Sequence, residues 1–223
     1  LERKGDRTLL VVTRGFRDQL RIAYQARPRL FDQHIVLPEM LYERIEEVSE
    51  RVDANDNILL PLDLDDLAPR LQAAFDDGIR AIAIVLMHGY RVPAHEQKIA
   101  ALAKRIGFSQ ISTSHDTSPM IKFVGRGNTT VADAYLSPIL RRYINRLAGD
   151  LDASAQTKLQ MMQSNGGLTD AGLFQGKDAI LSGPAGGIVG AVKTANQAGF
   201  DKVITFDMGG TSTDVAHYEG AYE

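Results

Sequence analysis

The stretch Val203-Ile204-Thr205-Phe206-Asp207-Met208-Gly209-Gly210-Thr211-Ser212-Thr213-Asp214-Val215-Ala216 places a glycine pair and hydroxyl residues between two aspartates, directly after an apolar strand. Glycines permit positive φ and leave no Cβ in the way, so the backbone can approach a ligand closely. Turn N–H groups form an anion-binding concavity, and aspartates supply oxygen ligands to Mg²⁺. The pattern predicts a site for nucleotide phosphates, with a plain hairpin turn as the alternative.

The first half of the chain alternates between strand and helix patterns. We expect a strand at 8–13, a helix at 16–24, a strand at 42–51, a helix from Asp65 or Asp66 to Gly78, a strand at 79–87, a helix at 94–106 and a strand at 108–113. Helix and strand in alternation with short links indicate a parallel sheet covered by helices.

A second unit is predicted from residue 119 onward. We expect a long helical stretch at 121–150, kinked or split at Ser137-Pro138, then a strand at 158–163, a short extended segment at 179–181 and a helix at 182–198. The apolar strand that begins at Val203 and leads into the glycine pair follows that helix.

The composition is that of a globular protein of one large domain or two modest ones: 223 residues, 44% hydrophobic and 24% charged. The absence of cysteine excludes disulfides, thiolate metal sites and cysteine nucleophiles, and it fits a reducing, cytoplasmic compartment. No apolar run approaches the roughly 18 residues of a membrane span. Residues 1–5 resemble neither a signal peptide nor a natural start, so we expect a piece of a longer protein.

Charge is unevenly distributed along the chain. Residues 1–30 hold eight Lys or Arg and three Asp or Glu, a local charge of +5, whereas residues 31–80 hold four and thirteen, a local charge of −9. A nucleic-acid surface is one interpretation of the basic stretch. We favour pairing with the acidic stretch or a solvated face, and expect no nucleic-acid partner, because no aromatic platform or helix-turn-helix spacing accompanies the arginines.

Two further glycine-rich turns are candidate ligand contacts, through Asn165, Gly166, Gly183 and Gly186. The segment 183–187 opens a helix, where anions bind readily, although its glycines also permit close helix packing. The segment 164–167 ends a strand, where ligands bind in open α/β sheets; a tight turn capped by asparagine is the alternative.

Three histidines lie near strand ends. His88 ends a predicted strand, His95 begins a helix beside Glu96, and His115 follows a later strand. Metal binding by the three is one interpretation. Local backbone bonding suits the same positions, and we favour that structural role.

The segment 206–216 resembles the phosphate loop of the hydantoinase/5-oxoprolinase family, which comprises ATP-dependent N-methylhydantoinase A (hydantoin utilization protein A) and oxoprolinases, together with subunits of acetone and acetophenone carboxylases. Further similar segments occur in the family's order through the whole chain. They are Leu1-Glu2-Arg3-Lys4-Gly5, Thr13–Asp18, Arg27-Pro28, His88–Glu96, Ser114-His115, Ser118-Pro119, Thr129-Thr130-Val131, Ala134-Tyr135-Leu136, Gln163–Leu168 and Leu181–Gly187.

The resemblance implies an α/β fold of the actin-like ATPase (ribonuclease H-like) type, with mostly parallel sheets flanked by helices. Residues 1–118 would form the second part of the family's N-terminal domain, and residues 119–223 the start of its ATPase domain. Family members use ATP to activate a cyclic amide carbonyl by phosphorylation before the ring is opened.

The resemblance also implies site roles. Asp207 would hold Mg²⁺, and Asp214 would assist catalysis or fix the hairpin. ATP phosphates would be bound by the segment that contains Gly209, Gly210, Thr211, Ser212 and Thr213. The substrate would be a small cyclic amide, and a second, B-type subunit or domain would be the partner.

The family's other phosphate hairpin and its adenosine-binding segment have no counterpart here, so we expect the isolated fragment to be inactive. Two alternatives stay open at this stage: an ATP-using subunit of an acetone- or acetophenone-type carboxylase, and a nucleotide-binding scaffold without chemistry of its own.

Overall fold

A computed structural model describes residues 3–25, 29, 31–151, 158–210 and 212–221. The chain forms two compact units, residues 1–142 and 143–223. Arg27, Pro28 and Thr211, which contribute to the resemblance or to the predicted site, lie outside the described residues. The expected domain boundary between residues 118 and 119 stays a prediction, because compactness alone does not define a domain.

The first unit alternates strands and helices as expected. Its elements are β1 (Thr8–Thr13), α1 (Gln19–Ile22), β2 (Arg44–Val48), β3 (Arg51–Val52), β4 (Ile58–Leu60), α2 (Leu64–Asp76), β5 (Ala81–Val85), α3 (Ala94–Ile106), β6 (Gln110–Thr113) and α4 (Ser114–Thr117). Helix α5 (Phe123–Asp150) begins in this unit and ends in the next.

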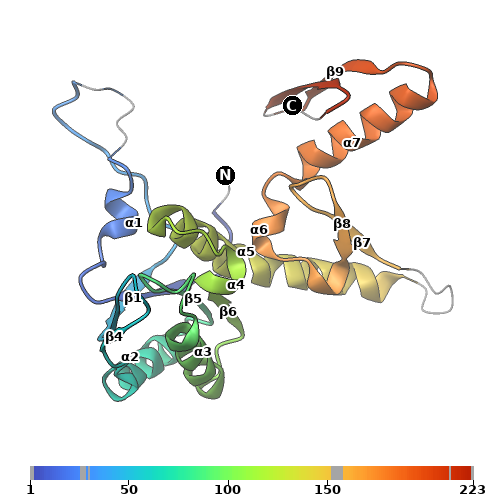
Figure 1. Cartoon of the computed structure of the whole chain (residues 1–223). Helices are drawn as coiled ribbons and strands as arrows, with labels where there is room; N and C mark the ends of the chain where they lie inside the picture. The colour runs from blue at the N-terminus through green and yellow to red at the C-terminus, as the bar shows by residue number, and fades with distance from the viewer. Residues whose placement is uncertain (1–2, 26–28, 30, 152–157, 211, 222–223) are drawn as a thin grey trace. The chain divides into compact units, whose positions relative to one another are not determined.

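Four parallel strands form the central sheet, in the order β2-β1-β5-β6. Strand β1 is buried along its whole length because both faces of the sheet are covered. Leu9 and Val11 pack into a core with residues of α2 and α3, whereas Leu10 and Val12 pack with residues of α1 and α5. Figure 1 shows α2 and α3 on one side of this sheet and α5 on the other. The predicted α/β class, with a parallel sheet flanked by helices, is confirmed.

Helix α2 shows how the sequence fixes one of these covering layers. Its cap is Asp63, whose carboxylate accepts a hydrogen bond from Asp66 N at 3.0 Å, so the helix begins slightly earlier than predicted. Leu67 and Leu71 are fully buried against the sheet. Each such side chain contributes roughly 1.5–3 kcal/mol through burial. Pro69 lies inside the helix, in its second turn.

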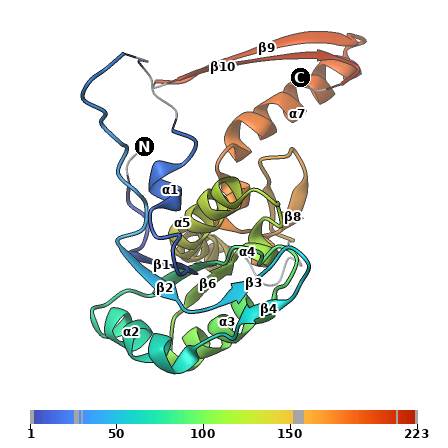
Figure 2. The ribbon, with the colours of Figure 1, turned by 60° about the vertical axis from the view of Figure 1, so that its left-hand side comes forward.

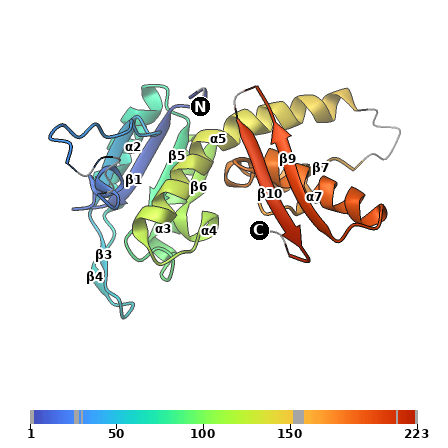
Figure 3. The same cartoon turned by 90° about the horizontal axis from the view of Figure 1, so that it is seen from above.

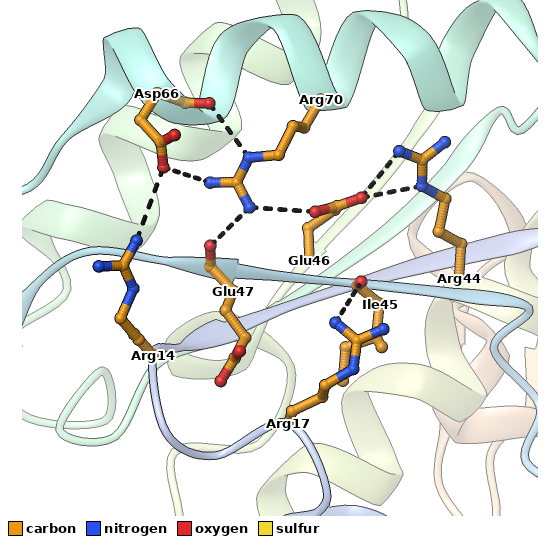
Figure 4. Close-up of polar contacts among 8 residues, drawn as sticks. All are labelled: Arg14, Arg17, Arg44, Ile45, Glu46, Glu47, Asp66 and Arg70. Carbon is orange, nitrogen blue, oxygen red and sulfur yellow. Dashed lines mark hydrogen bonds and ion pairs between the residues drawn. The ribbon is translucent and has the colours of Figure 1, made fainter.

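The basic N-terminal stretch is paired with the acidic stretch that follows it. Arg7 forms ion pairs with Glu43 at 2.5 Å and Asp77 at 2.7 Å. Arg14 lies 3.9 Å from Asp66, and Figure 4 shows these two side chains facing each other at the start of a wider charged cluster. Exposed pairs of this kind contribute about 0–1 kcal/mol each. The pairing interpretation of the uneven charge is confirmed for these arginines.

Two segments of the first unit differ from expectation. The predicted helix at 16–24 is only the single turn α1, because Ala23 and Gln25 adopt positive φ angles of 49° and 56° that end it. The predicted strand at 42–51 divides into β2 and β3, and β3 pairs with β4 in a small antiparallel hairpin that projects from the sheet (Figure 3).

The second unit contains two antiparallel hairpins and one long helix. Its elements are β7 (Gln160–Met162), β8 (Leu168–Asp170), the 3-10 turn η2 (Ala171–Leu173), α6 (Gly176–Ala179), α7 (Ser182–Gln197), β9 (Lys202–Met208) and β10 (Thr213–Glu219). β7 pairs with β8, and β9 pairs with β10. Figure 2 shows the β9–β10 ribbon and α7 as the main features of this unit.

Two details of the second half of the chain differ from the sequence-based expectations. The predicted extended segment at 179–181 is wrong, because Ala179 ends α6 and Ile180 has helical angles (φ −59°, ψ −42°). Pro138 lies inside the single helix α5, so the proline does not split the helix, and the alternative of a kink there stays a prediction.

Candidate phosphate-binding site

The β9–β10 hairpin places Asp207 and Asp214 directly opposite each other. The register pairs Met208 with Thr213 and Asp207 with Asp214. Directly opposed residues of an antiparallel pair project from the same face, with Cβ atoms about 4.5–5.5 Å apart. Both aspartates are exposed and therefore accessible to a ligand.

The bend between these strands is short and rich in glycine. Gly209 N–H donates to the Ser212 carbonyl at 2.9 Å, which closes the turn. This amide is therefore engaged within the hairpin, and phosphate binding by the segment around Gly209 stays a prediction. Gly210 and Ser212 are exposed at the tip.

Helix α7 lies against the face of the hairpin that carries the two aspartates. A pocket of about 590 Å³ lies between them. Its lining includes Ser164, Pro184, Gly187, Asp207 and Asp214. The pocket thus brings the predicted phosphate hairpin together with the first turns of a helix, where the helix dipole favours anions.

Gly187 on α7 lies beside Asp207 of the hairpin. A Cβ built at this position would lie 3.8 Å from Asp207 Oδ2. The sequence predicted an anion site over the whole segment 183–187, with Gly183 and Gly186 named as contacts and close helix packing as the alternative. The signal that could have placed Gly187 beside the hairpin is helical periodicity, because Pro184, Gly187, Ile188 and Ala191 follow the i, i+3, i+4, i+7 spacing of one helix face and all line the pocket.

The two aspartates fit the requirements of Mg²⁺. This ion prefers oxygen ligands, keeps several waters, and is commonly bound by one or two carboxylates together with substrate phosphates. Two carboxylates on one hairpin face, lining one pocket, meet that description. Within the described part of the chain, no group of three or more His, Cys, Asp or Glu side chains could hold a metal ion. A site in which the protein supplies three or more of these ligands is therefore not found there.

The Asn165 turn is explained by local structure. Asn165 Oδ1 accepts from Gly167 N at 2.9 Å, and Gly166 has φ +81°, a conformation that glycine adopts readily. Ser164 Oγ accepts from Leu181 N at 3.0 Å and so ties the turn to the start of α7. Ser164, rather than Asn165 or Gly166, lines the pocket, and no sequence signal distinguished it.

The other two glycine candidates differ in their surroundings. A Cβ at Gly186 would lie 3.4 Å from Met162 Cγ, so this position allows α7 to pack on β7. Gly183 is exposed, and a Cβ there would meet nothing within 4 Å. Neither residue lines the pocket.

The three histidines do not form a joint metal site among the described residues. His95 Nδ1 contacts Glu50 Oε2 at 2.9 Å, and His115 Nδ1 contacts Glu96 Oε2 at 2.6 Å. The His88 ring lies near that of Tyr90, with centroids 6.3 Å apart. The predicted local backbone bonding is not what the rings of His95 and His115 make: each contacts a carboxylate that is distant in sequence.

Among the described residues, no helix is both long enough and apolar enough to cross a membrane.

Residues 1–107 match the family model described as "Hydantoinase/oxoprolinase N-terminal region", and residues 126–223 match the one described as "Hydantoinase/oxoprolinase". The two matches therefore cover most of the chain.

Individual relatives agree with these matches. The chain is 42% identical over 244 aligned residues to 5-oxoprolinase 1 of Arabidopsis thaliana, covering 100% of this chain and 19% of that protein. It is 30% identical over 233 residues to the acetophenone carboxylase gamma subunit of Aromatoleum aromaticum, covering 97% of this chain and 32% of that protein.

A solved structure has the same fold. The ATP-dependent caprolactamase from Pseudomonas jessenii superposes with a TM-score of 0.83 at 30% sequence identity, covering 96% of this chain and 32% of that chain. The chain thus spans between a fifth and a third of the length of these three proteins. By its sequence and its fold, the chain belongs to the hydantoinase/oxoprolinase family.

Proposed function

We propose that this chain supplies a phosphate-binding part of an ATP-dependent cyclic amide hydrolase that opens a hydantoin, 5-oxoproline or similar lactam ring. The observation that carries this proposal is the opposed pair Asp207 and Asp214 beside the first turns of α7. Like charges directly opposite each other destabilise a hairpin. A cation that belongs to a bound nucleotide would offset that repulsion.

Each group at the pocket has a proposed task. Asp207 would hold Mg²⁺ or a water of its hydration shell, and Asp214 would assist through a water. When bound, Mg²⁺ would neutralise charge on the phosphate oxygens during transfer. Phosphate oxygens would be contacted by the Gly210 amide, by Thr211 and by the Thr213 hydroxyl. The N-terminal turns of α7 would add a favourable dipole.

Phosphorylation makes chemical sense for this class of substrate. A lactam carbonyl is a poor electrophile because its nitrogen delocalises electrons into it. Transfer of the γ-phosphoryl group to the carbonyl oxygen turns that oxygen into a good leaving group, and positioning with charge neutralisation accounts for most of the catalysis of such a transfer. The ATP dependence in the name of the similar caprolactamase supports this proposal.

The experiment is ADP release by the full-length protein, screened against lactams, hydantoins and ketones with bicarbonate. We expect release that depends on a cyclic amide, and Asp207→Asn should lower it by about 10²-fold or more, as expected when several kcal/mol of charge stabilisation are lost. The matched control is Asp201→Asn, an exposed aspartate outside the pocket lining, which should keep full turnover. Unchanged turnover in Asp207→Asn removes this residue from the mechanism.

A carboxylase subunit is the second candidate, favoured by the similarity to the acetophenone carboxylase gamma subunit. In that case a second subunit of B type would complete the enzyme. ADP release that requires both a ketone and bicarbonate, with no response to lactams, would select this function. ATP binding without turnover on any substrate would instead select a non-catalytic scaffold.

A further inference from the structure

Strand β9 carries apolar side chains on both of its faces. Successive side chains of a strand point to opposite faces, so Val203 lies on the face of the two aspartates, toward α7. Ile204, Phe206 and Met208 lie on the opposite face, where β10 adds Val215 directly across from Phe206. These four residues are called the outer face below. A strand that is apolar on both faces is typical of the interior of a sheet that is covered on both sides.

The two faces of the hairpin differ in burial. Toward α7, which packs against both strands (Figure 2), Val203 and Ala216 are partly buried. The outer face is open, with exposed fractions of 74% for Ile204, 67% for Phe206, 72% for Met208 and 61% for Val215. Single apolar side chains on a surface need no explanation, but a contiguous group on one sheet face marks an interaction surface.

Strand β1 provides an internal comparison, because it is also apolar on both faces. Leu9 and Val11 pack with residues of α2 and α3, whereas Leu10 and Val12 pack with residues of α1 and α5. It also has a neighbouring strand on each side, β2 and β5. The described residues give β9 one neighbouring strand, β10, and α7 on one face. Its sequence therefore fits a central strand that lacks a second covering layer and a second neighbour.

The relatives indicate where the missing layer comes from. The chain covers 19% of the Arabidopsis thaliana 5-oxoprolinase 1 and 32% of the caprolactamase chain, so these proteins contain much further polypeptide. Strands that follow one another in sequence are neighbours in space roughly two-thirds of the time, because connections are short. Polypeptide that follows β10 is therefore the best placed to reach the hairpin.

Charge does not favour a charged partner at this surface. Lys202 and Glu219 are directly opposed at the end of the hairpin away from the bend, on the same side as the outer face, and they form an ion pair. The pair balances its own charge, and the rest of the outer face is mainly apolar. An apolar layer fits it, because burial of apolar area is the main driving force for such packing.

We propose that the outer face of the β9–β10 hairpin is the docking surface for the polypeptide that follows residue 223 in the full-length protein. That polypeptide adds at least one strand to the two-stranded hairpin and packs apolar side chains on Ile204, Phe206, Met208 and Val215. A two-stranded hairpin is only marginally stable by itself, and a sheet of three or more strands with a covered face is not. The inference concerns folding and does not depend on the proposed function.

The test uses a single new thiol on the outer face. Residues 1–223 contain no cysteine, so Val215→Cys introduces the one reactive thiol of this segment. A thiol reagent should modify it as fast as an exposed thiol in the 223-residue chain, and at least about 10²-fold more slowly in the full-length protein, with the site located by mass spectrometry. Arg105→Cys, at an exposed position of α3, is the matched control and should react fast at both lengths. Equal rates for Val215→Cys at the two lengths overturn the inference.

Two other occupants give different results in the same experiment. If a second copy covers the outer face, protection of Val215→Cys appears in the 223-residue chain and increases with its concentration. If another part of the 223 residues covers it, protection appears in that chain at every concentration. Either result overturns the inference.

Hydrogen exchange of the unmodified protein replaces the thiol test if Val215→Cys does not fold. The β9 amides that are not bonded to β10 should exchange at least about 10-fold more slowly in the full-length protein than in the 223-residue chain, because an added strand bonds them. Equal exchange at both lengths overturns the inference. Turnover is not measured in either experiment, so a failure of the proposed function would leave both outcomes unchanged.

Discussion

Asp207 and Asp214 are cross-strand partners on the face of the β9–β10 hairpin that lies toward α7, and Asp207 Oδ2 lies close to the backbone of Gly187. Two carboxylates at directly opposed positions repel each other, and both are exposed rather than paired within the core. The arrangement costs stability and leaves oxygen ligands directed at an open pocket. This is the physical basis of the proposed phosphate site.

The first prediction concerns that repulsion. Without Mg²⁺ or nucleotide, Asp207→Asn in this 223-residue chain should increase the free energy of unfolding by about 0.2–1 kcal/mol, because one charge of a like-charged pair is removed. Urea denaturation measures the change, and Asp201→Asn should leave stability unaltered. A loss of stability in Asp207→Asn would show that the carboxylate fixes the hairpin instead of straining it.

The second prediction concerns the buried guanidinium. Arg126→Met should destabilise the chain by about 3–5 kcal/mol, because the buried acceptors Ser114 Oγ, Leu86 O and Met87 O would lose the donors that the fully buried guanidinium supplies. Chemical denaturation of this variant can be compared with that of Arg105→Met, an exposed position on α3 that should change stability by at most about 0.5 kcal/mol. Equal stability of the two variants would contradict the role assigned to Arg126.

A pair of glycines gives the third prediction. Gly107 ends α3 with φ +116°, and a Cβ there would lie 3.0 Å from Phe75 Cζ. Gly107→Ala should cost about 1–2 kcal/mol because the left-handed conformation strains any residue with a Cβ. Gly149→Ala, in α5 with nothing within 4 Å, should instead stabilise by up to about 1 kcal/mol. Thermal unfolding of both variants shows whether each substitution raises or lowers stability. A stabilised Gly107→Ala would refute the account of this cap.

The fourth prediction follows from the pKa of His115, which the hydrogen bond to Glu96 raises. A group whose pKa is higher in the folded state binds its proton more tightly there, so its contribution to stability is complete below the unfolded value of about 6.5. That contribution disappears as pH rises through the higher folded pKa. The difference in unfolding free energy between wild type and His115→Asn should therefore shrink from pH 5.5 to pH 8. A constant difference would contradict a raised pKa.

Periodic patterns were enough to predict most of the fold. Helix α3 has the predicted bounds 94–106, because an apolar stripe, a preceding proline and a closing glycine all agree. The single turn α1 was overestimated, since nothing in the local pattern signals the positive φ of Ala23. The segment around Ile180 was misjudged because three apolar residues fit a short strand and a helix turn equally well.

The candidate site was predicted only in part. The aspartate–glycine stretch was recognisable because its residue types limit the chemistry that they can support. The pairing of Asp207 with Asp214 needed the strand register, and the contribution of Gly187 needed the packing of α7 on the hairpin. Arg126 and Glu96, which both bond Ser114 Oγ, lie thirty residues apart, and no local pattern connects them.

The central claim is that the bend between the two aspartates of β9–β10 holds the phosphates of a bound nucleotide with a metal ion beside them. The most direct measurement is a crystal structure of the full-length protein with a non-hydrolysable ATP analogue and Mn²⁺ in place of Mg²⁺, using anomalous scattering. We predict an anomalous peak within coordination distance of Asp207 or of a water that it holds, with phosphate oxygens at the Gly210 turn. A bound nucleotide with its metal peak away from both aspartates would contradict the account.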